Sequence, residues 1–171
     1  AGQAEALMTG VRALGGQATH VPFLSITPVR DPALALMASA LTTYQAVLFI
    51  SANAVQSSWS TLTNGMPWPP SLPAATVGPG TARHLRERGV KQVLMPDQQF
   101  DSEGLLALPF FAPVHCEGRS FALIRGEGGR DLLAQRLRAM GARVDEAACY
   151  QRALNPAAVP ELQSLFPMGP A

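Results

Sequence analysis

The stretch LIRGEGGRDLL, which runs from Leu123 to Leu133, decides how the chain is interpreted. An apolar run ends at Arg125, and an apolar-periodic segment begins at Arg130. Between them lie three glycines, Gly126, Gly128 and Gly129. This order predicts a strand, a glycine turn and the first turn of a helix. Because the first N–H groups of a helix have no partner within it and point outward, the stretch predicts a site for an anion.

The same alternation of strand and helix recurs along the whole chain. Helical spacing of apolar residues predicts helices near residues 7–14, 33–41, 53–62, 81–88, 102–108 and 130–140. Apolar runs between them predict strands at 20–26, 46–51, 74–78, 91–95, 120–126 and 143–152. Apolar strands that alternate with helices are typical of an α/β fold, in which helices cover both faces of a parallel sheet.

Ligands of such sheets bind at the carboxyl ends of the strands, beside helix N-termini. Three further junctions resemble the opening stretch: FISANAV (49–55), VGPGTARHL (77–85) and FDSEGLLALP (100–109). Four helix starts at one edge suit a ligand with several carboxylates or phosphates. The alternative is ordinary structure: Asn53, Thr81 and Ser102 cap their own helices, and the glycines serve only as turn residues. Only the four junctions together favour a ligand site.

Composition excludes several classes of function. With 13 Lys and Arg against 12 Asp and Glu, the net charge is +1, so we expect neither a nucleic-acid partner nor a membrane surface. The chain is 47% hydrophobic and 15% charged, which predicts a folded domain. Cys116 and Cys149 lack metal-binding spacing, so we expect no metal and a reduced, cytoplasmic protein.

Nucleotide motifs are missing as well. A dinucleotide fingerprint would need glycine at position 131, where this chain has Asp131, whose carboxylate would repel a pyrophosphate. Neither a P-loop nor the G-x-S-x-G nucleophile elbow occurs. We therefore expect no cofactor.

Taken in order, these stretches resemble the uroporphyrinogen-III synthase family. The resemblance is carried by Phe49, Ser51, Asn53, Ala54, Val55, Val77, Gly78, Thr81, Ala82, Arg125, Gly126, Gly129, Leu133, Gly141, Val144, Tyr150 and Arg152. One departure is Ile50, where the family usually has threonine. The resemblance implies two α/β lobes, one inserted within the other and joined by a two-stranded antiparallel linker, with the substrate between them.

The resemblance also implies how the chain is divided. Residues 25–148 would be the complete inserted lobe, with a five-stranded parallel, flavodoxin-like sheet covered by helices on both faces. Residues 21–27 and 147–154 would be the linker strands. Residues 1–20 and 155–171 would be remnants of the other lobe, whose exposed apolar residues would favour self-association. The fragment itself is expected to be inactive, and the full-length protein to be a cytoplasmic monomer.

The implied reaction is the cyclisation of a linear tetrapyrrole polycarboxylate, hydroxymethylbilane, to uroporphyrinogen III. Water is lost and the last pyrrole ring is inverted, without a cofactor. Tyr150 and Thr81 would be the catalytic residues. The expected substrate-binding residues are Ser51, Ala52, Asn53, Gly80, Ala82, Ser102, Glu103, Gly104, Arg125, Gly126, Gly128, Gly129 and Arg130.

Three alternatives stay open on the sequence alone. Tyr150 fits equally well as an amphipathic residue at the end of a strand. The chain also fits a non-catalytic, flavodoxin-like domain that binds an anion or regulates a partner, although no acidic cluster of the phosphoacceptor kind follows its strands. A ligand-binding lobe of the periplasmic type is the third, disfavoured by the lack of a visible signal peptide.

Overall fold

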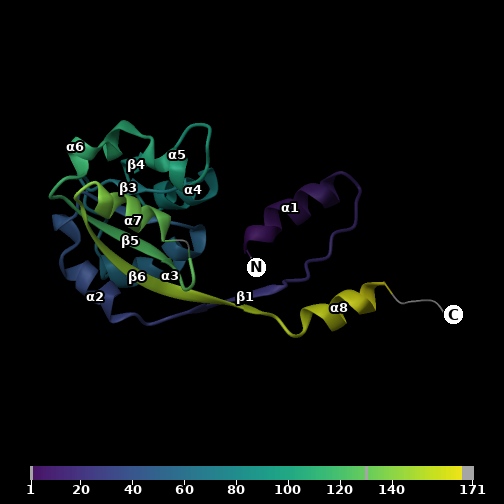
Figure 1. Ribbon diagram of the computed structural model, residues 1–171. Helices are drawn as coiled ribbons and strands as arrows, with labels where there is room; N and C mark the ends of the chain where they lie inside the picture. Colours follow the sequence, from purple (N-terminus) through teal and green to yellow (C-terminus); the bar gives the residue numbers. More distant parts are fainter. Residues whose placement is uncertain (1, 130, 167–171) are drawn as a thin grey trace. The chain divides into compact units, whose positions relative to one another are not determined.

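A computed structural model describes residues 2–129 and 131–166 of the chain. Its strands form one six-stranded sheet in the order β1-β6-β5-β2-β3-β4 (Figure 1). The strands are β1 (Leu24–Pro28), β2 (Ala46–Phe49), β3 (Ala74–Ala75), β4 (Val93–Leu94), β5 (Ser120–Gly126) and β6 (Arg143–Leu154). Each neighbouring pair from β6 to β4 is parallel, as the alternation of strand and helix predicts.

The helices occupy the connections between these strands and both ends of the chain. They are α1 (Gly2–Ala13), α2 (Pro32–Ser39), α3 (Ala52–Thr63), α4 (Pro79–Glu87), α5 (Ser102–Leu106), α6 (Pro113–Cys116), α7 (Leu132–Ala139) and α8 (Ala158–Leu165), with short 3₁₀ turns at Leu41–Thr43 and Pro109–Phe111. Helices α6 and α8 lie outside the predicted elements.

Strand β1 is antiparallel to β6. The Val29 N–H donates to the Cys149 carbonyl at 3.0 Å, and the Asn155 N–H donates to the Phe23 carbonyl at 2.9 Å, so the numbering rises on one strand as it falls on the other. The predicted five-stranded parallel sheet with a separate linker is therefore only approximate. Strand β6 is one strand of 12 residues that pairs with β5 and also has β1 as its neighbour, so linker and sheet are continuous.

The position of β1 also differs from the expected strand at 20–26, because the strand begins only at Leu24. Pro22 has no N–H to donate to a neighbouring strand, so it cannot extend the ladder in that direction. The Pro22 carbonyl instead accepts a hydrogen bond from the Asn155 side chain at 2.8 Å.

The chain divides into two compact units. The sheet unit is Ile26–Gln151, and the terminal unit is Ala1–Ser25 with Arg152–Ala171. In the terminal unit several large apolar side chains are exposed: Leu7 of α1 at 72%, Leu14 just after α1 at 91%, and Leu162 and Leu165 of α8 at 38% and 43%. The assignment of these segments to a second lobe stays a prediction.

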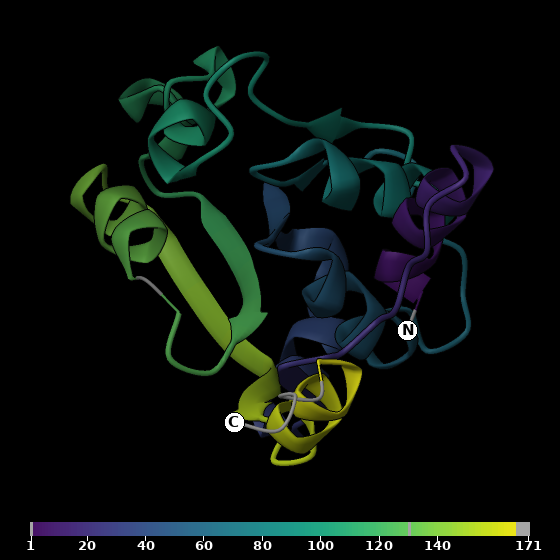
Figure 2. The same cartoon turned by 90° about the vertical axis from the view of Figure 1, so that its right-hand side faces the viewer.

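The sheet unit has a core on each face of the sheet. Strand β2 is completely buried, and its side chains alternate between the two cores: Val47 and Phe49 pack with α2 and α3, whereas Ala46 and Leu48 pack on the opposite face with α7. Figure 2 shows α7 on one side of β5 and β6 and the blue helices α2 and α3 on the other. Burial on both faces explains why β2 is a continuous apolar run.

Candidate functional site

The four junctions of the sequence analysis all follow strands of the parallel sheet. Helix α3 follows β2, α4 follows β3, α5 follows β4, and α7 follows β5. Because these strands are parallel, their carboxyl ends lie at one edge of the sheet, so the predicted placement of the four junctions is confirmed. What they bind stays a prediction.

The first junction begins at Ser51. This residue is the N-cap of α3, and its Oγ accepts a hydrogen bond from the Ala54 N–H at 3.0 Å. Ala52 and Asn53 form the first turn of the helix. The same Ser51 Oγ lies 3.0 Å from the hydroxyl oxygen of Tyr150, a residue 99 positions further along the chain. Two candidate residues from different elements therefore share a hydrogen bond.

The face on which Tyr150 lies is decided by a β-bulge. Arg125 is paired with Ala148, but the next residue of β5, Gly126, is paired with Tyr150, so Cys149 is an extra residue on β6. Strict alternation would place Cys149 and Tyr150 on opposite faces, yet both belong to the core beneath α2 and α3. The bulge thus turns Tyr150 toward the face that also carries α3.

The Tyr150 ring packs against Gly126, in space that a side chain at that position would fill. A Cβ atom added to Gly126 would lie 2.6 Å from Cζ of Tyr150, closer than non-bonded carbon atoms approach, and 3.0 Å from its hydroxyl oxygen. A residue with a side chain would therefore push the ring away. Tyr150 is only 4% exposed, so it is mostly enclosed by protein.

The second junction rules out the alternative that Thr81 caps its own helix. Helix α4 begins at Pro79, with Gly78 as its N-cap and no hydrogen bond from a capping side chain. Pro79 favours this start because its fixed φ suits the first helical position and the N–H it lacks would have no partner there. Thr81 is the third residue of α4 and is 8% exposed. Gly80 is exposed, and Ala82 is buried.

The third junction rules out the alternative that Ser102 caps α5. The N-cap is Asp101, whose Oδ1 accepts from the Gly104 N–H at 2.8 Å. Gly104 is needed because a Cβ there would lie 1.9 Å from the Gln99 carbonyl oxygen. Since the Asp101 carboxylate already occupies this helix start, the stretch from Ser102 through Glu103 to Gly104 is the least suited of the four to a second anion.

The fourth junction is the glycine turn between β5 and α7. Gly128 has φ +68, a left-handed conformation that glycine adopts without strain. The Arg125 guanidinium donates to the Gly129 carbonyl at 2.9 Å and forms ion pairs with Asp131 at 2.6 Å and Glu146 at 3.0 Å. Arg125 therefore holds the turn through contacts within the protein.

Two further observations define this turn. Glu146 also pairs with Arg138 at 2.9 Å, so α7 and β6 both contribute to the ion pairs around Arg125. Nothing in the sequence predicts that Asp131, Arg138 and Glu146 join these ion pairs, because it is the fold that brings Glu146 to Arg125 and Arg138 to Glu146. Arg130, an expected binding residue, lies outside the described residues.

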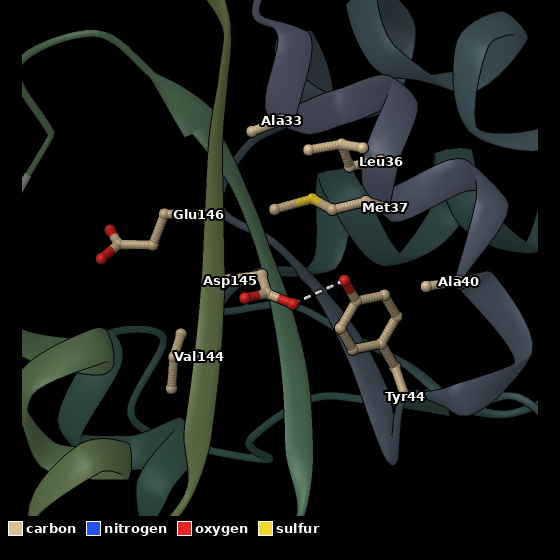
Figure 3. A pocket seen from close by; sticks show the side chains of 8 residues that line it. All are labelled: Ala33, Leu36, Met37, Ala40, Tyr44, Val144, Asp145 and Glu146. Atoms are coloured by element: carbon tan, nitrogen blue, oxygen red, sulfur yellow. Dashed lines mark hydrogen bonds between the residues drawn. The ribbon is translucent and has the colours of Figure 1, made fainter.

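A surface pocket of about 380 Å³ lies elsewhere, between α2 and the first residues of β6 (Figure 3). Met37 and Ala40 line it, and the Tyr44 hydroxyl donates to Asp145 Oδ2 at 2.7 Å. Burial, and then the hydrogen bond and charge of Asp145, raise the pKa of Tyr44 above its ordinary value. The pocket is at the amino end of β6, so it is separate from the junctions at the carboxyl ends.

Among residues 2–129 and 131–166, no group of three or more His, Cys, Asp or Glu side chains is placed to hold a metal ion. No helix within that part of the chain is both long enough and apolar enough to cross a membrane.

Comparison with known proteins identifies the family. The family model described as "Uroporphyrinogen-III synthase HemD" matches residues 5–170. The uroporphyrinogen-III synthase of Proteus mirabilis is 34% identical over 140 residues, which cover 81% of this chain and 69% of that protein. The chain belongs to the uroporphyrinogen-III synthase family. This membership favours the catalytic interpretation over a flavodoxin-like regulatory domain and over a periplasmic-type binding lobe.

Other uroporphyrinogen-III synthases show how much of the family's length is present. The Salmonella typhimurium protein is 34% identical over 150 residues, which are 86% of this chain and 60% of that protein. A wild-type crystal structure from Thermus thermophilus matches with a TM-score of 0.55 at 21% identity. The match covers 94% of this chain and 62% of the Thermus thermophilus chain. The Helicobacter pylori structure has a TM-score of 0.51 at 20% identity, covering 85% of this chain and 60% of its own. These structures support the fold, and the chain spans about three fifths of such proteins.

Proposed function

We propose that the protein containing this chain converts hydroxymethylbilane to uroporphyrinogen III, with loss of water and inversion of the last pyrrole ring. Family membership supports the reaction. The observation that carries the assignment of residues is the Tyr150 hydroxyl, 3.0 Å from Ser51 Oγ at the carboxyl edge of the sheet.

Tyr150 is the proposed general acid of the first step. The bond between carbon and the substrate's hydroxyl oxygen breaks, and the electron pair leaves with the oxygen. That oxygen takes the phenolic proton of Tyr150, so water departs and the azafulvene remains as its N-protonated cation, beside the negatively charged phenol oxygen. No oxidant, reductant or cofactor is required, because the pyrrole nitrogen supplies the electron pair.

Ring closure then restores the acid. The substituted position of the last pyrrole ring attacks the azafulvene, and the resulting spiro intermediate fragments and recloses with that ring inverted. The final closure releases a proton from the ring carbon, which replaces the proton given up by Tyr150. Because hydroxymethylbilane also cyclises spontaneously to the uninverted isomer, the enzyme contributes mainly by holding the conformation that inverts.

The helix starts are the proposed sites for the acetate and propionate groups of the substrate. Helix α4 fits this role well, because Gly78 leaves its first N–H groups without a capping side chain and Gly80 is exposed. At the glycine turn, Gly126, Gly128 and Gly129 would contribute backbone N–H groups. Arg125 would act by holding the turn, since its charge is already paired with two carboxylates.

Product analysis tests the proposal. The longest available protein that contains this sequence is incubated with hydroxymethylbilane, and the products are oxidised and separated by isomer. We expect predominantly the inverted isomer. Formation of only the uninverted isomer, at the rate of a protein-free control, would overturn the proposal.

We also propose that the chain by itself does not enforce inversion, that the full-length protein is a monomer, and that it acts in the cytoplasm. Cys116 and Cys149 are both free, buried thiols, which agrees with a reducing compartment. Predominant formation of the inverted isomer by the 171-residue chain, in the assay above, would contradict the first of these proposals.

A further inference from the structure

Ser51 is held from two directions. Its Oγ accepts a hydrogen bond from the Ala54 N–H at 3.0 Å, which fixes the oxygen at the first turn of α3. The same oxygen lies 3.0 Å from the Tyr150 hydroxyl oxygen. Helix α3 therefore places one hydroxyl group against the phenol of the proposed general acid.

The orientation of the Tyr150 side chain is restricted by its surroundings. The bulge at Cys149 turns its side chain to the face of α3, and the missing Cβ of Gly126 leaves the space that the ring fills. Rotation about the bond that carries the hydroxyl still leaves open the direction of its proton. The contact with Ser51 Oγ acts on that direction.

We propose that Ser51 is a positioning residue that orients the Tyr150 hydroxyl for proton transfer. This inference rests on the proposed function. Ser51 Oγ carries one proton, and because it already accepts from Ala54, it can donate that proton to the Tyr150 oxygen. When Tyr150 gives its own proton to the departing hydroxyl, the phenol oxygen gains negative charge, and the Ser51 O–H points at that charge. The serine proton stays on Ser51 throughout.

Two substitutions separate this role from helix capping. Ser51→Gly removes the hydroxyl, but glycine is itself an acceptable N-cap and the extended backbone at this position suits it. Ser51→Thr keeps both the cap and the hydroxyl. A structural role predicts that both variants behave like the wild type, whereas a positioning role predicts that only Ser51→Thr does.

The contact itself is measured by NMR on protein with [13Cζ]-tyrosine. The chain has only two tyrosines, and Tyr44→Phe assigns the two signals. We expect Ser51→Gly to shift the Tyr150 signal and to leave that of Tyr44 unchanged, because the Tyr44 hydroxyl is bonded to Asp145. Ser51→Thr is expected to keep both signals near their wild-type positions.

The catalytic consequence is measured in the protein used for product analysis. We expect Ser51→Gly to lower kcat about tenfold with KM nearly unchanged, since general acid catalysis as a whole contributes about 100-fold or more. Ser51→Thr should restore most of kcat. Ser51→Gly added to Tyr150→Phe should cause little further loss, because the serine acts through the phenol.

The outcomes distinguish this inference from the proposed function. An active wild type whose Ser51→Gly variant keeps full kcat and an unshifted Tyr150 signal would overturn the positioning role. A wild type that forms no inverted isomer overturns the proposed function, even when the Tyr150 signal shifts. A kcat loss that Ser51→Thr shares equally also contradicts the positioning role, because threonine retains the hydroxyl.

Discussion

The two tyrosines of the chain lie in different regions of the sheet unit and have different partners. Tyr44, at the amino end of β6, donates to the Asp145 carboxylate at 2.7 Å (Figure 3). Tyr150, near the carboxyl end of β5, is hydrogen bonded to the Ser51 hydroxyl at 3.0 Å. Both are largely buried, at 7% and 4% exposure, so burial does not distinguish them.

The partner makes the difference. An ionised carboxylate only accepts hydrogen bonds, so Tyr44 must donate its proton to Asp145. This contact also helps to raise the pKa of Tyr44. A serine hydroxyl can donate as well as accept, so Tyr150 does not have to donate its proton to Ser51. A phenol beside a hydroxyl can serve as an acid, whereas a phenol beside a carboxylate is better suited to fixing structure.

The largest loss of stability and turnover is expected from Gly126→Ala, because the new side chain would clash with the Tyr150 ring. The new Cβ would overlap the ring, so either the ring or the backbone must move. We expect a loss of stability of about 1–3 kcal/mol, typical of overpacked sites, and more than 100-fold lower turnover as the general acid is displaced. Urea unfolding and isomer analysis measure the two effects.

A matched glycine provides the stability control for that variant. A Cβ at Gly80 would meet nothing within 4 Å, and the residue lies within helix α4. Gly80→Ala should therefore leave stability unchanged or raise it by up to about 1 kcal/mol. Equal destabilisation by both substitutions would contradict the close packing of Tyr150 on Gly126.

Removing each phenolic hydroxyl in turn compares the two regions. Tyr150→Phe is expected to lower turnover about 100-fold, because the proton donor is lost. Folding should be nearly intact, with a loss of about 1 kcal/mol for the hydrogen bond to Ser51. Tyr44→Phe should leave turnover at the wild-type level. Wild-type turnover in Tyr150→Phe would reduce that residue to a packing role.

Thr81→Ala asks whether any hydroxyl near this edge of the sheet has the effect expected of Tyr150. Because the N-cap of α4 is Gly78, the substitution removes no cap, and we expect a stability change below about 1 kcal/mol. Turnover should fall by about tenfold if Thr81 positions substrate, a smaller loss than that of an acid. A loss as large as that of Tyr150→Phe would make Thr81 an equal candidate for the chemistry.

The smallest effect is a pH dependence confined to the Tyr44 region. The folded pKa of Tyr44 is raised above the ordinary value of 10.0, so the stabilisation is complete below about pH 10. Above that pH the unfolded chain loses the proton first, and stability falls until the folded pKa is passed. We expect the stability difference between wild type and Tyr44→Phe to shrink above pH 10. A difference that is constant to higher pH would contradict the raised pKa.

Much of the fold could be predicted because its signals are local in the sequence. Buried parallel strands need continuous apolar runs, and AVLF in β2 is such a run. The stretch after β5 was expected to form a glycine turn before a helix, and α7 begins at Leu132. The identity of the caps could not be predicted: the N-caps are Ser51, Gly78 and Asp101, whereas the ordinary-structure alternative assigned that role to Asn53, Thr81 and Ser102. The choice of cap depends on backbone dihedrals, which neighbouring residues such as Pro79 influence.

The sequence by itself determined the parallel sheet, the four junctions and their common edge, because apolar periodicity and turn residues are properties of short segments. Tertiary structure alone decided which side chains meet there. Tyr150 reaches Ser51 because the pairing of β6 with β5 contains an extra residue at Cys149, and Arg125 meets Glu146 because β5 and β6 are neighbours. The hydrophobic pattern of a strand fixes which face is buried, but which residues of two distant strands pair, and where one carries an extra residue, depends on both strands together.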